Sequence, residues 1–316
     1  MVVFSSSSIK RVCMKATPDT PKRLLLAHGF TLIELLVVVV MLLLLGWMLV
    51  PTHAATGVKS RSIRCLDNLH ELMGAVIMYT QDNHDLYPPN PDDGNTVSGH
   101  NWCAGQAGVG GPAQFNPDLM SDPTRCLITA YIKSNVIRFL CPADTRMGQY
   151  QGADPARIGT QVPAVRSLAM NGAVGTVCPS FSGTGSSHSG KPTLSVNGPW
   201  LNNTHSHKRN SPWRTYGKVA ETVVPGPAKL AVLLDEDAYS VNDASFSFGM
   251  NAAEWLDFPA TRHSLGCTLA FADGRVEFHK WEDPRTPVKD GNVTRRAVPG
   301  SADWQWLSER ISAPTP

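Results

Sequence analysis

The stretch "GFTLIELLVVVVMLLLLGW", Gly29 to Trp47, separates a short basic leader from the rest of a 316-residue chain. From Leu32 to Leu45 every residue except Glu34 is apolar, a pattern typical of a helix in lipid, because a helix on a soluble core keeps one polar face. The 21 residues from Phe30 to Val50 extend over about 31 Å as a helix, enough to cross a bilayer core. A carboxylate inside such a segment is costly and indicates a function.

The distribution of charge gives this segment an orientation. Residues 1–29 carry five basic residues and one acidic residue, a net charge of +4 in a chain whose total is +2. A basic excess before an apolar segment keeps the N-terminus in the cytoplasm and predicts export of the rest. The remainder has a net charge of about −2, so nucleic acid is not an expected partner. An ordinary secretory signal cleaved after Ala55 is an alternative, but the apolar run exceeds the usual signal length.

The residues Gly29, Phe30 and Glu34, followed by an unbroken apolar run, resemble the N-terminal cleavage and methylation motif of type IV prepilins and type II secretion pseudopilins. The resemblance implies that a prepilin peptidase cleaves between Gly29 and Phe30 and that the amino group of Phe30 is then methylated. It also implies that Glu34 pairs with the N-terminal ammonium of a neighbouring subunit. That pairing would relieve the cost of a carboxylate in a low dielectric, so Glu34 would set the assembly register.

Four segments follow from this interpretation: a leader at 1–29, a transmembrane segment at 30–50, an amphipathic continuation of the helix at 51–80 and an exported domain at 81–316. Pro51 can kink the helix, and a separate soluble helix after a loop at 51–57 remains an alternative. Either Met1 or Met14 could be the true start. Apolar residues then recur at helical spacing: Ile63, Leu66, Leu69, Met73, Val76 and Ile77.

The sequence predicts short strands joined by long loops in the exported part, since the whole chain contains 26 Gly and 24 Pro residues. Strands are expected at 135–142, 164–172 and 228–237. A hairpin is expected at 267–281, with a two-residue type I′ turn at Asp273-Gly274 that pairs Phe271 with Val276 and places Phe278 on the core face.

The spacing of His263, Asp273 and Gly274 carries a second resemblance, to the His-x9-Asp-Gly signature of a C-terminal domain found with prepilin-type N-termini. The implied fold class is α+β and pilin-like: a long N-terminal helix packed on an antiparallel β-sheet with long loops. Six strand residues separate the two ends of the motif by roughly 20 Å. We therefore interpret the motif as structural and expect no catalytic residue, bound metal or cofactor.

Three residue groups leave chemical alternatives open. Six cysteines follow the leader, and an exported domain can oxidise them, with fifteen possible pairings; Cys126 with Cys141 is the favoured pair. The acidic run at 234–243 is interpreted as a solvated turn, with calcium binding as the alternative. The sequence His205-Ser206-His207 lacks further ligands at zinc spacing.

The predicted function is a non-enzymatic pilin- or pseudopilin-like subunit, a minor or specialised component of a type IV pilus-like or type II secretion assembly. Its expected partners are prepilin peptidase, other subunits through the N-terminal helix, and the inner membrane. The expected location is single-pass in the inner membrane with the C-terminal domain periplasmic or on the cell surface. The alternative is a membrane-tethered envelope protein that binds a ligand such as a glycan through Trp200 and Trp213.

Overall fold

The computed structural model describes residues 31–177 and 193–316, and it describes side chains there except at 46–59. The leader and the predicted cleavage site at Gly29 and Phe30 therefore lie outside the described residues. The chain divides into two compact units, Met1–Thr52 and His53–Pro316, and the boundary falls within helix α1, Leu32–Asp82. Of the helices in these described ranges, none is both long and apolar enough to cross a membrane.

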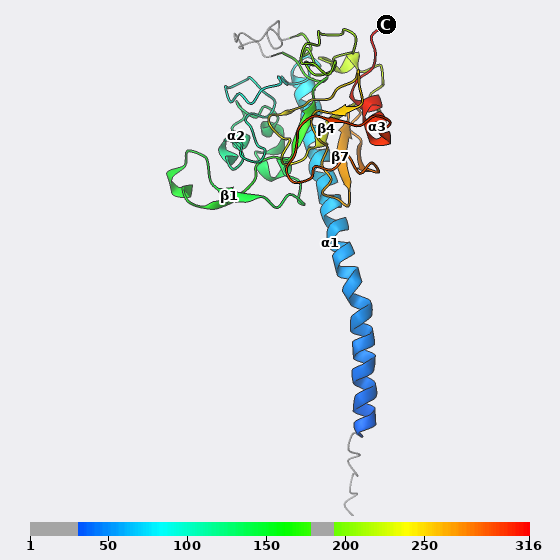
Figure 1. The fold of residues 1–316 in the computed structure, drawn as a ribbon. Helices are drawn as coiled ribbons and strands as arrows, with labels where there is room; N and C mark the ends of the chain where they lie inside the picture. The colour runs from blue at the N-terminus through cyan, green and yellow to red at the C-terminus, as the bar shows by residue number, and fades with distance from the viewer. Residues whose placement is uncertain (1–30, 178–192) are drawn as a thin grey trace, which may run out of the picture. The chain divides into compact units, whose positions relative to one another are not determined.

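The second unit is built on a five-stranded sheet in the order β5-β3-β4-β7-β8. In Figure 1, β4 and β7 lie side by side, with the C-terminal helix α3 next to them. Both of these inner strands are buried at every residue, which explains their nearly continuous apolar sequences. The strands are β3 (Leu168–Asn171), β4 (Ala231–Asp235), β5 (Ser245–Phe246), β7 (Gly266–Phe271) and β8 (Val276–Lys280).

Smaller elements surround this sheet. Two separate two-stranded sheets pair β1 (Met147–Gln149) with β2 (Gln161–Pro163) and β6 (Glu254–Trp255) with β9 (Arg296–Ala297). The helices are α2 (Pro117–Ser121), α3 (Ala302–Ile311) and the 3-10 turns η1 (Thr129–Ile132), η2 (Val136–Phe139), η3 (Pro155–Arg157) and η4 (Val219–Glu221). The strands expected within 164–172 and 228–237 are confirmed as β3 and β4. The strand expected at 135–142 is wrong: η2 occupies it, because a short apolar run has no period that excludes a helix.

The predicted fold class is wrong. The central sheet is mixed rather than antiparallel, because β5 pairs in parallel with β3. After β4 the chain turns through residues 236–244 and returns beyond β3, since β7 already occupies the other edge of β4. Of the expected long N-terminal helix, only the part of α1 after Thr52 belongs to the unit that contains the sheet. There, Leu69, Met73 and Val76 are buried in the hydrophobic core.

The hairpin β7–β8 forms with a different turn and register from those expected. Phe271 N–H donates to Arg275 O at 2.8 Å, and Gly274 N–H donates to Phe271 O at 2.9 Å. The loop therefore has three residues and ends in a bulge at Gly274, whose φ is +90°. The extra residue shifts every pair by one and turns β8 over. Phe278, expected in the core, is 40% exposed, and Val276 no longer faces Phe271.

Candidate metal centre

Glu34 forms a helix cap at the start of α1. Its Oε2 accepts hydrogen bonds from the Thr31 backbone N–H at 2.9 Å and from Thr31 Oγ1 at 2.8 Å. In return, Glu34 N–H donates to Thr31 Oγ1 at 3.3 Å. This reciprocal arrangement is a capping box, which satisfies N–H groups that the first helical turn leaves without partners. This local role of Glu34 differs from the assembly role expected from the resemblance, and the Thr-x-x-Glu spacing is its signal in the sequence.

The two ends of the His-x9-Asp-Gly motif lie at opposite ends of β7. His263 precedes the strand, where its N–H donates to Gly266 O at 3.4 Å. Asp273 follows the strand, where its N–H donates to Pro227 O at 3.2 Å and its Oδ1 accepts from Arg275 N–H at 3.0 Å. Asp273 and Gly274 are thus accounted for by the turn. His263 instead belongs to a different group of residues.

Four buried side chains of metal-ligand type converge around His263. The cluster comprises Cys65, Cys141, Asp235 and His263, and one donor atom from each lies within 4.8 Å of all the others. Cys65 comes from α1, Cys141 follows η2, Asp235 ends β4, and His263 lies just before β7. The core packing that brings α1 against the sheet therefore also assembles this site from four separate segments.

Hydrogen bonds fix the orientation of the imidazole and the sulfur atoms. Nε2 of His263 lies 3.0 Å from Sγ of Cys141, and Nδ1 lies 3.1 Å from Oγ of Ser62. Sγ of Cys141 also accepts from the backbone N–H of Ala143 at 3.4 Å. Sγ of Cys65 lies 3.2 Å from Oγ1 of Thr268. Contacts with Ser62, Thr268 and Ala143 therefore hold the two cysteines and the histidine in place.

Asp235 brings a buried negative charge to the cluster. Its residue is 1% exposed, and Oδ1 accepts from Arg262 Nη1 at 2.7 Å. Within the described residues, Oδ2 of Asp235 accepts no hydrogen bond. Arg262 is also 3.5 Å from Asp144 and donates to Glu236 O at 2.7 Å. Burial raises the pKa of Asp235, while the positive charge of Arg262 opposes that shift.

The ionisable groups of the cluster shift one another. The hydrogen bond from Cys65, followed by burial, raises the pKa of the Cys141 thiol well above its usual range. Burial alone would lower the pKa of His263, but its hydrogen bond to Cys141 and the nearby negative charges raise it overall. Without a cation, the Cys141 thiol therefore remains protonated at neutral pH.

No protein-family model, curated protein or solved structure matches this chain. The function of the site is therefore argued from its own chemistry. The cluster around His263 could not be predicted from the sequence, because its four residues lie far apart in the chain. A partial signal was available: Cys65 lies four residues before Leu69, on the apolar stripe that α1 buries.

The other cysteine pairing differs from the one expected. Cys126 is hydrogen-bonded to Cys103 rather than close to Cys141, and Cys103 Sγ lies 3.3 Å from Met120 Sδ. Cys178 lies outside the described residues. Among the residues that are described, no histidine or carboxylate joins Cys103 and Cys126 in a group of metal-ligand type. The two cysteine pairs therefore have different surroundings: an imidazole and a carboxylate lie beside Cys65 and Cys141, whereas the Met120 thioether and the charge of Arg166 lie near Cys103 and Cys126.

The other sequence candidates for metal binding have ordinary partners. His205 Nε2 lies 3.1 Å from Asp92 Oδ2, whereas His207 Nδ1 donates to Asn197 O at 2.6 Å. Of the acidic run at 234–243, Asp235 joins the cysteine cluster. No other group of three ligand-type residues occurs in the described ranges. Most residues at 234–243 are buried, so the solvated turn expected there is wrong.

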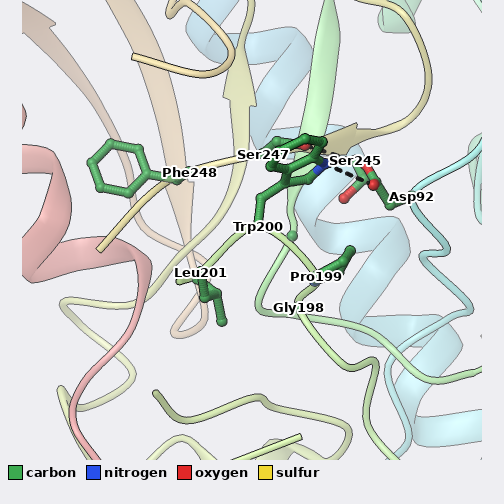
Figure 2. A pocket seen from close by; sticks show the side chains of 9 residues that line it. Asp92, Gly198, Pro199, Trp200, Leu201, Ser245, Ser247 and Phe248 are labelled. Carbon is green, nitrogen blue, oxygen red and sulfur yellow. Dashed lines mark hydrogen bonds between the residues drawn. The ribbon is translucent and has the colours of Figure 1, made fainter. Parts of the chain in front are cut away.

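A cavity beside Trp200 is the second candidate site. Trp200 Nε1 donates to Asp92 Oδ2 at 2.9 Å, which holds the indole over a nearly filled pocket of about 10 Å³ (Figure 2). A neighbouring cavity of about 240 Å³ is lined by Trp200 together with Tyr239, Asp257 and Arg295. Aromatic, carboxylate and guanidinium groups therefore face one open space.

Proposed function

We propose that this chain is an exported, membrane-anchored subunit processed by a prepilin peptidase, with a structural rather than enzymatic role. Its place would be a minor or specialised component of a type IV pilus-like or type II secretion assembly. The anchor would be the segment 30–50, with the unit beginning at His53 on the outer side of the inner membrane. This proposal concerns processing, location and role, and it does not depend on a pilin-like fold.

The observation that carries the proposal is the capping box at the start of an apolar helix. From Leu32 to Leu45 the side chains are exposed all around α1, with fractions as high as 82% for Leu32 and 68% for Leu43. An exposed apolar surface this extensive needs a partner, such as lipid or the helices of other subunits. Glu34 is the one charged residue in that stretch, and its bonds to Thr31 place the carboxylate at the helix start. Peptidase cleavage after Gly29 would create a new ammonium group on Phe30, the residue immediately before Thr31.

Mass spectrometry of the mature protein extracted from membranes tests the proposal. Phe30 is expected as the N-terminal residue, with a methyl group on its amino nitrogen. Gly29→Glu is expected to leave the intact precursor in the membrane, whereas Gly74→Glu, at a position with no neighbouring atom within 4 Å, offers a control outside the apolar segment for which cleavage continues. A mature protein that begins at Thr56 would identify a signal peptidase instead and would contradict the proposal.

A second candidate function, binding of a ligand such as a glycan, rests on the cavity beside Trp200. Arg295 lies 5.9 Å from the Trp200 ring centroid, and its Nε donates to Glu254 at 2.9 Å. These contacts hold an aromatic face and polar groups ready beside an open cavity, a combination suited to small polar ligands. Trp213 is placed differently: its Nε1 donates to Asn251 at 2.8 Å, and its ring packs partly on the core.

Quenching of tryptophan fluorescence by a panel of oligosaccharides tests this second function. Trp200→Phe is expected to weaken binding, while Trp213→Phe serves as the matched control because its side chain does not line the cavity. Equal binding by both variants and the wild type would exclude the cavity as the ligand site.

A further inference from the structure

We propose that Cys65, Cys141, Asp235 and His263 form a structural site for one divalent transition-metal ion of the zinc class. The argument rests on the geometry of these buried residues and is independent of the proposed route of export. The four donor groups comprise two thiolates, one imidazole and one carboxylate, each of which is a known zinc ligand type.

The distances fit a closed tetrahedral site. Metal–sulfur bonds of about 2.3 Å and metal–nitrogen bonds of about 2.0 Å place tetrahedral ligand atoms about 3.5 Å apart. The four donors all lie within 4.8 Å of one another, and the His263–Cys141 pair is already at 3.0 Å. Shifts of about an ångström or less would therefore close the donors around an ion. All four residues are buried, so the site lacks the open position that a catalytic zinc needs.

The surrounding hydrogen bonds are those that support metal ligands. Histidine ligands usually bind through one ring nitrogen and hydrogen-bond through the other. Here Nε2 of His263 faces the cluster, and Nδ1 faces Ser62 Oγ at 3.1 Å. A thiolate is stabilised by N–H and O–H donors, and Cys141 receives Ala143 N–H while Cys65 has Thr268 Oγ1. Ser62, Ala143 and Thr268 would then act as positioning residues.

The Asp235 carboxylate is a second observation that favours a cation. Asp235 is almost fully buried, and although Ser167 lies beside its carboxyl group, among the described residues Oδ2 has no donor at full hydrogen-bond geometry. Arg262 provides one positive charge for this carboxylate. Two thiolates would then balance the two charges of a divalent ion. Buried polar atoms without partners are rare in native proteins and call for an unseen ion or water.

The binding step is balanced in protons and charge. The ion replaces one proton on each thiol, so M²⁺ and two S–H groups give one dithiolate complex and two released protons. The histidine would bind through an unprotonated Nε2, and the carboxylate beside Arg262 would bind in its ionised form. No oxidant or reductant is needed. Binding is therefore expected to strengthen as pH rises.

A disulfide between Cys65 and Cys141 is the competing outcome, and the pair Cys103 and Cys126 provides a comparison within the same chain. Both pairs are buried. Within residues 31–177 and 193–316, only the first pair has an imidazole and a carboxylate within ligand distance. A disulfide would need neither of these groups, whereas a metal site uses both.

The test uses the full chain in detergent, stripped of metal with a chelator and kept reduced, and titrated first with Co²⁺ and then with Zn²⁺. One equivalent of Co²⁺ is expected to give thiolate charge-transfer absorption and intense visible bands typical of tetrahedral cobalt, and one equivalent of Zn²⁺ is expected to abolish them. Cys65→Ser is expected to lose much of the charge-transfer band. Cys126→Ser, the matched control, is expected to retain the wild-type spectrum. Ser62→Ala is expected to weaken Co²⁺ binding by about 10- to 100-fold.

The wild-type titration decides the question even if a ligand variant fails to fold. Absence of a charge-transfer band from reduced wild-type protein would overturn the proposal. So would an equal loss of that band in Cys126→Ser, because it would place the metal at the other pair. Peptide mass mapping of protein isolated without added metal supplies the last outcome: a Cys65–Cys141 disulfide in all molecules would replace the metal site with a cross-link.

Discussion

Nε2 of His263 lies 3.0 Å from Sγ of Cys141, although 122 positions separate them in the chain. This contact links the start of β7 to the segment after η2, and both residues are buried. The histidine of the His-x9-Asp-Gly motif is therefore tied to a cysteine rather than to the aspartate of its own motif.

Arg262→Gln is expected to destabilise the protein by about 3–5 kcal/mol, because it leaves the buried carboxylate of Asp235 without its cation, whereas Asp144 keeps its pair with Arg146. The matched control is Arg275→Gln, which breaks a pair with Glu277 in which the two side chains are 42% and 30% exposed. That change is expected to cost less than about 1 kcal/mol. Denaturant unfolding of both variants provides the comparison, and equal losses would show that Arg262 does not compensate buried charge.

Gly274→Val is expected to destabilise the hairpin by about 2 kcal/mol, because a β-branched residue is strained at a φ of +90°. The added Cβ would also lie 3.3 Å from Ile77 Cδ1. Asp273→Asn is the control, since its side-chain oxygen can still accept from Arg275 N–H. Thermal melting measures both. A normal melt for Asp273→Asn together with loss of function in cells would point instead to a site at the hairpin tip.

The raised pKa of Asp257 predicts that the stability of the fold depends on pH. Burial raises its pKa to about 7, above that of an unfolded aspartate. Between about pH 4 and 7 the folded state therefore holds a proton that the unfolded state releases. The contribution of Asp257 to the free energy of unfolding consequently falls as pH rises. Above the folded pKa the loss is complete. The nearby carboxyls of Glu236 and Asp243 are shifted in the same direction by burial, while Arg166 opposes the shift.

The measurement is the difference in melting temperature between wild type and Asp257→Asn across this range. Asn can still accept from the Ser247 N–H, which donates to Asp257 Oδ2 at 2.6 Å. The variant is expected to gain stability relative to wild type as pH rises from 4 to 8. A constant difference would mean that Asp257 titrates normally in the folded state.

Asn171→Ala is expected to cost about 2–3 kcal/mol because several buried backbone groups would lose their partner. Its Nδ2 donates to Ala231 O and Ile311 O, both at 2.8 Å, and its Oδ1 accepts from Ala173 N–H at 2.9 Å. One side chain thus joins β3, β4 and the end of α3. Asn292→Ala at an exposed loop is the control, with little change expected in denaturant unfolding. Similar midpoints for the two variants would contradict a linking role for Asn171.

Two variants of Glu34 separate the capping role from an assembly role. Glu34→Gln keeps an acceptor at the third helical position and retains the cap, whereas Glu34→Leu removes both the cap and the charge. If the negative charge pairs with a neighbouring subunit, both variants are expected to be excluded from sheared surface filaments while cleavage continues. Recovery of normal incorporation by Glu34→Gln alone would assign the effect to the cap.

Local sequence patterns predicted those elements that depend mainly on residues close together in the chain. The apolar run at 231–234 gave β4, and the Asp273-Gly274 pair marked the turn of the hairpin. The register of that hairpin was not predictable in the same way. One additional residue in the loop turns β8 over, and two- and three-residue loops both suit Asp-Gly, so only the contacts of the folded sheet select between them.

The sequence by itself determined the charge asymmetry around the apolar segment, the predicted cleavage motif, and the positions of β3 and β4, because each depends on composition or on neighbours in the chain. Only the tertiary structure decided that β5 runs parallel to β3, that Cys126 lies beside Cys103, and that Cys65, Cys141, Asp235 and His263 share one buried space. These outcomes depend on which segments far apart in sequence pack together, and a single sequence carries no local periodicity that encodes such contacts.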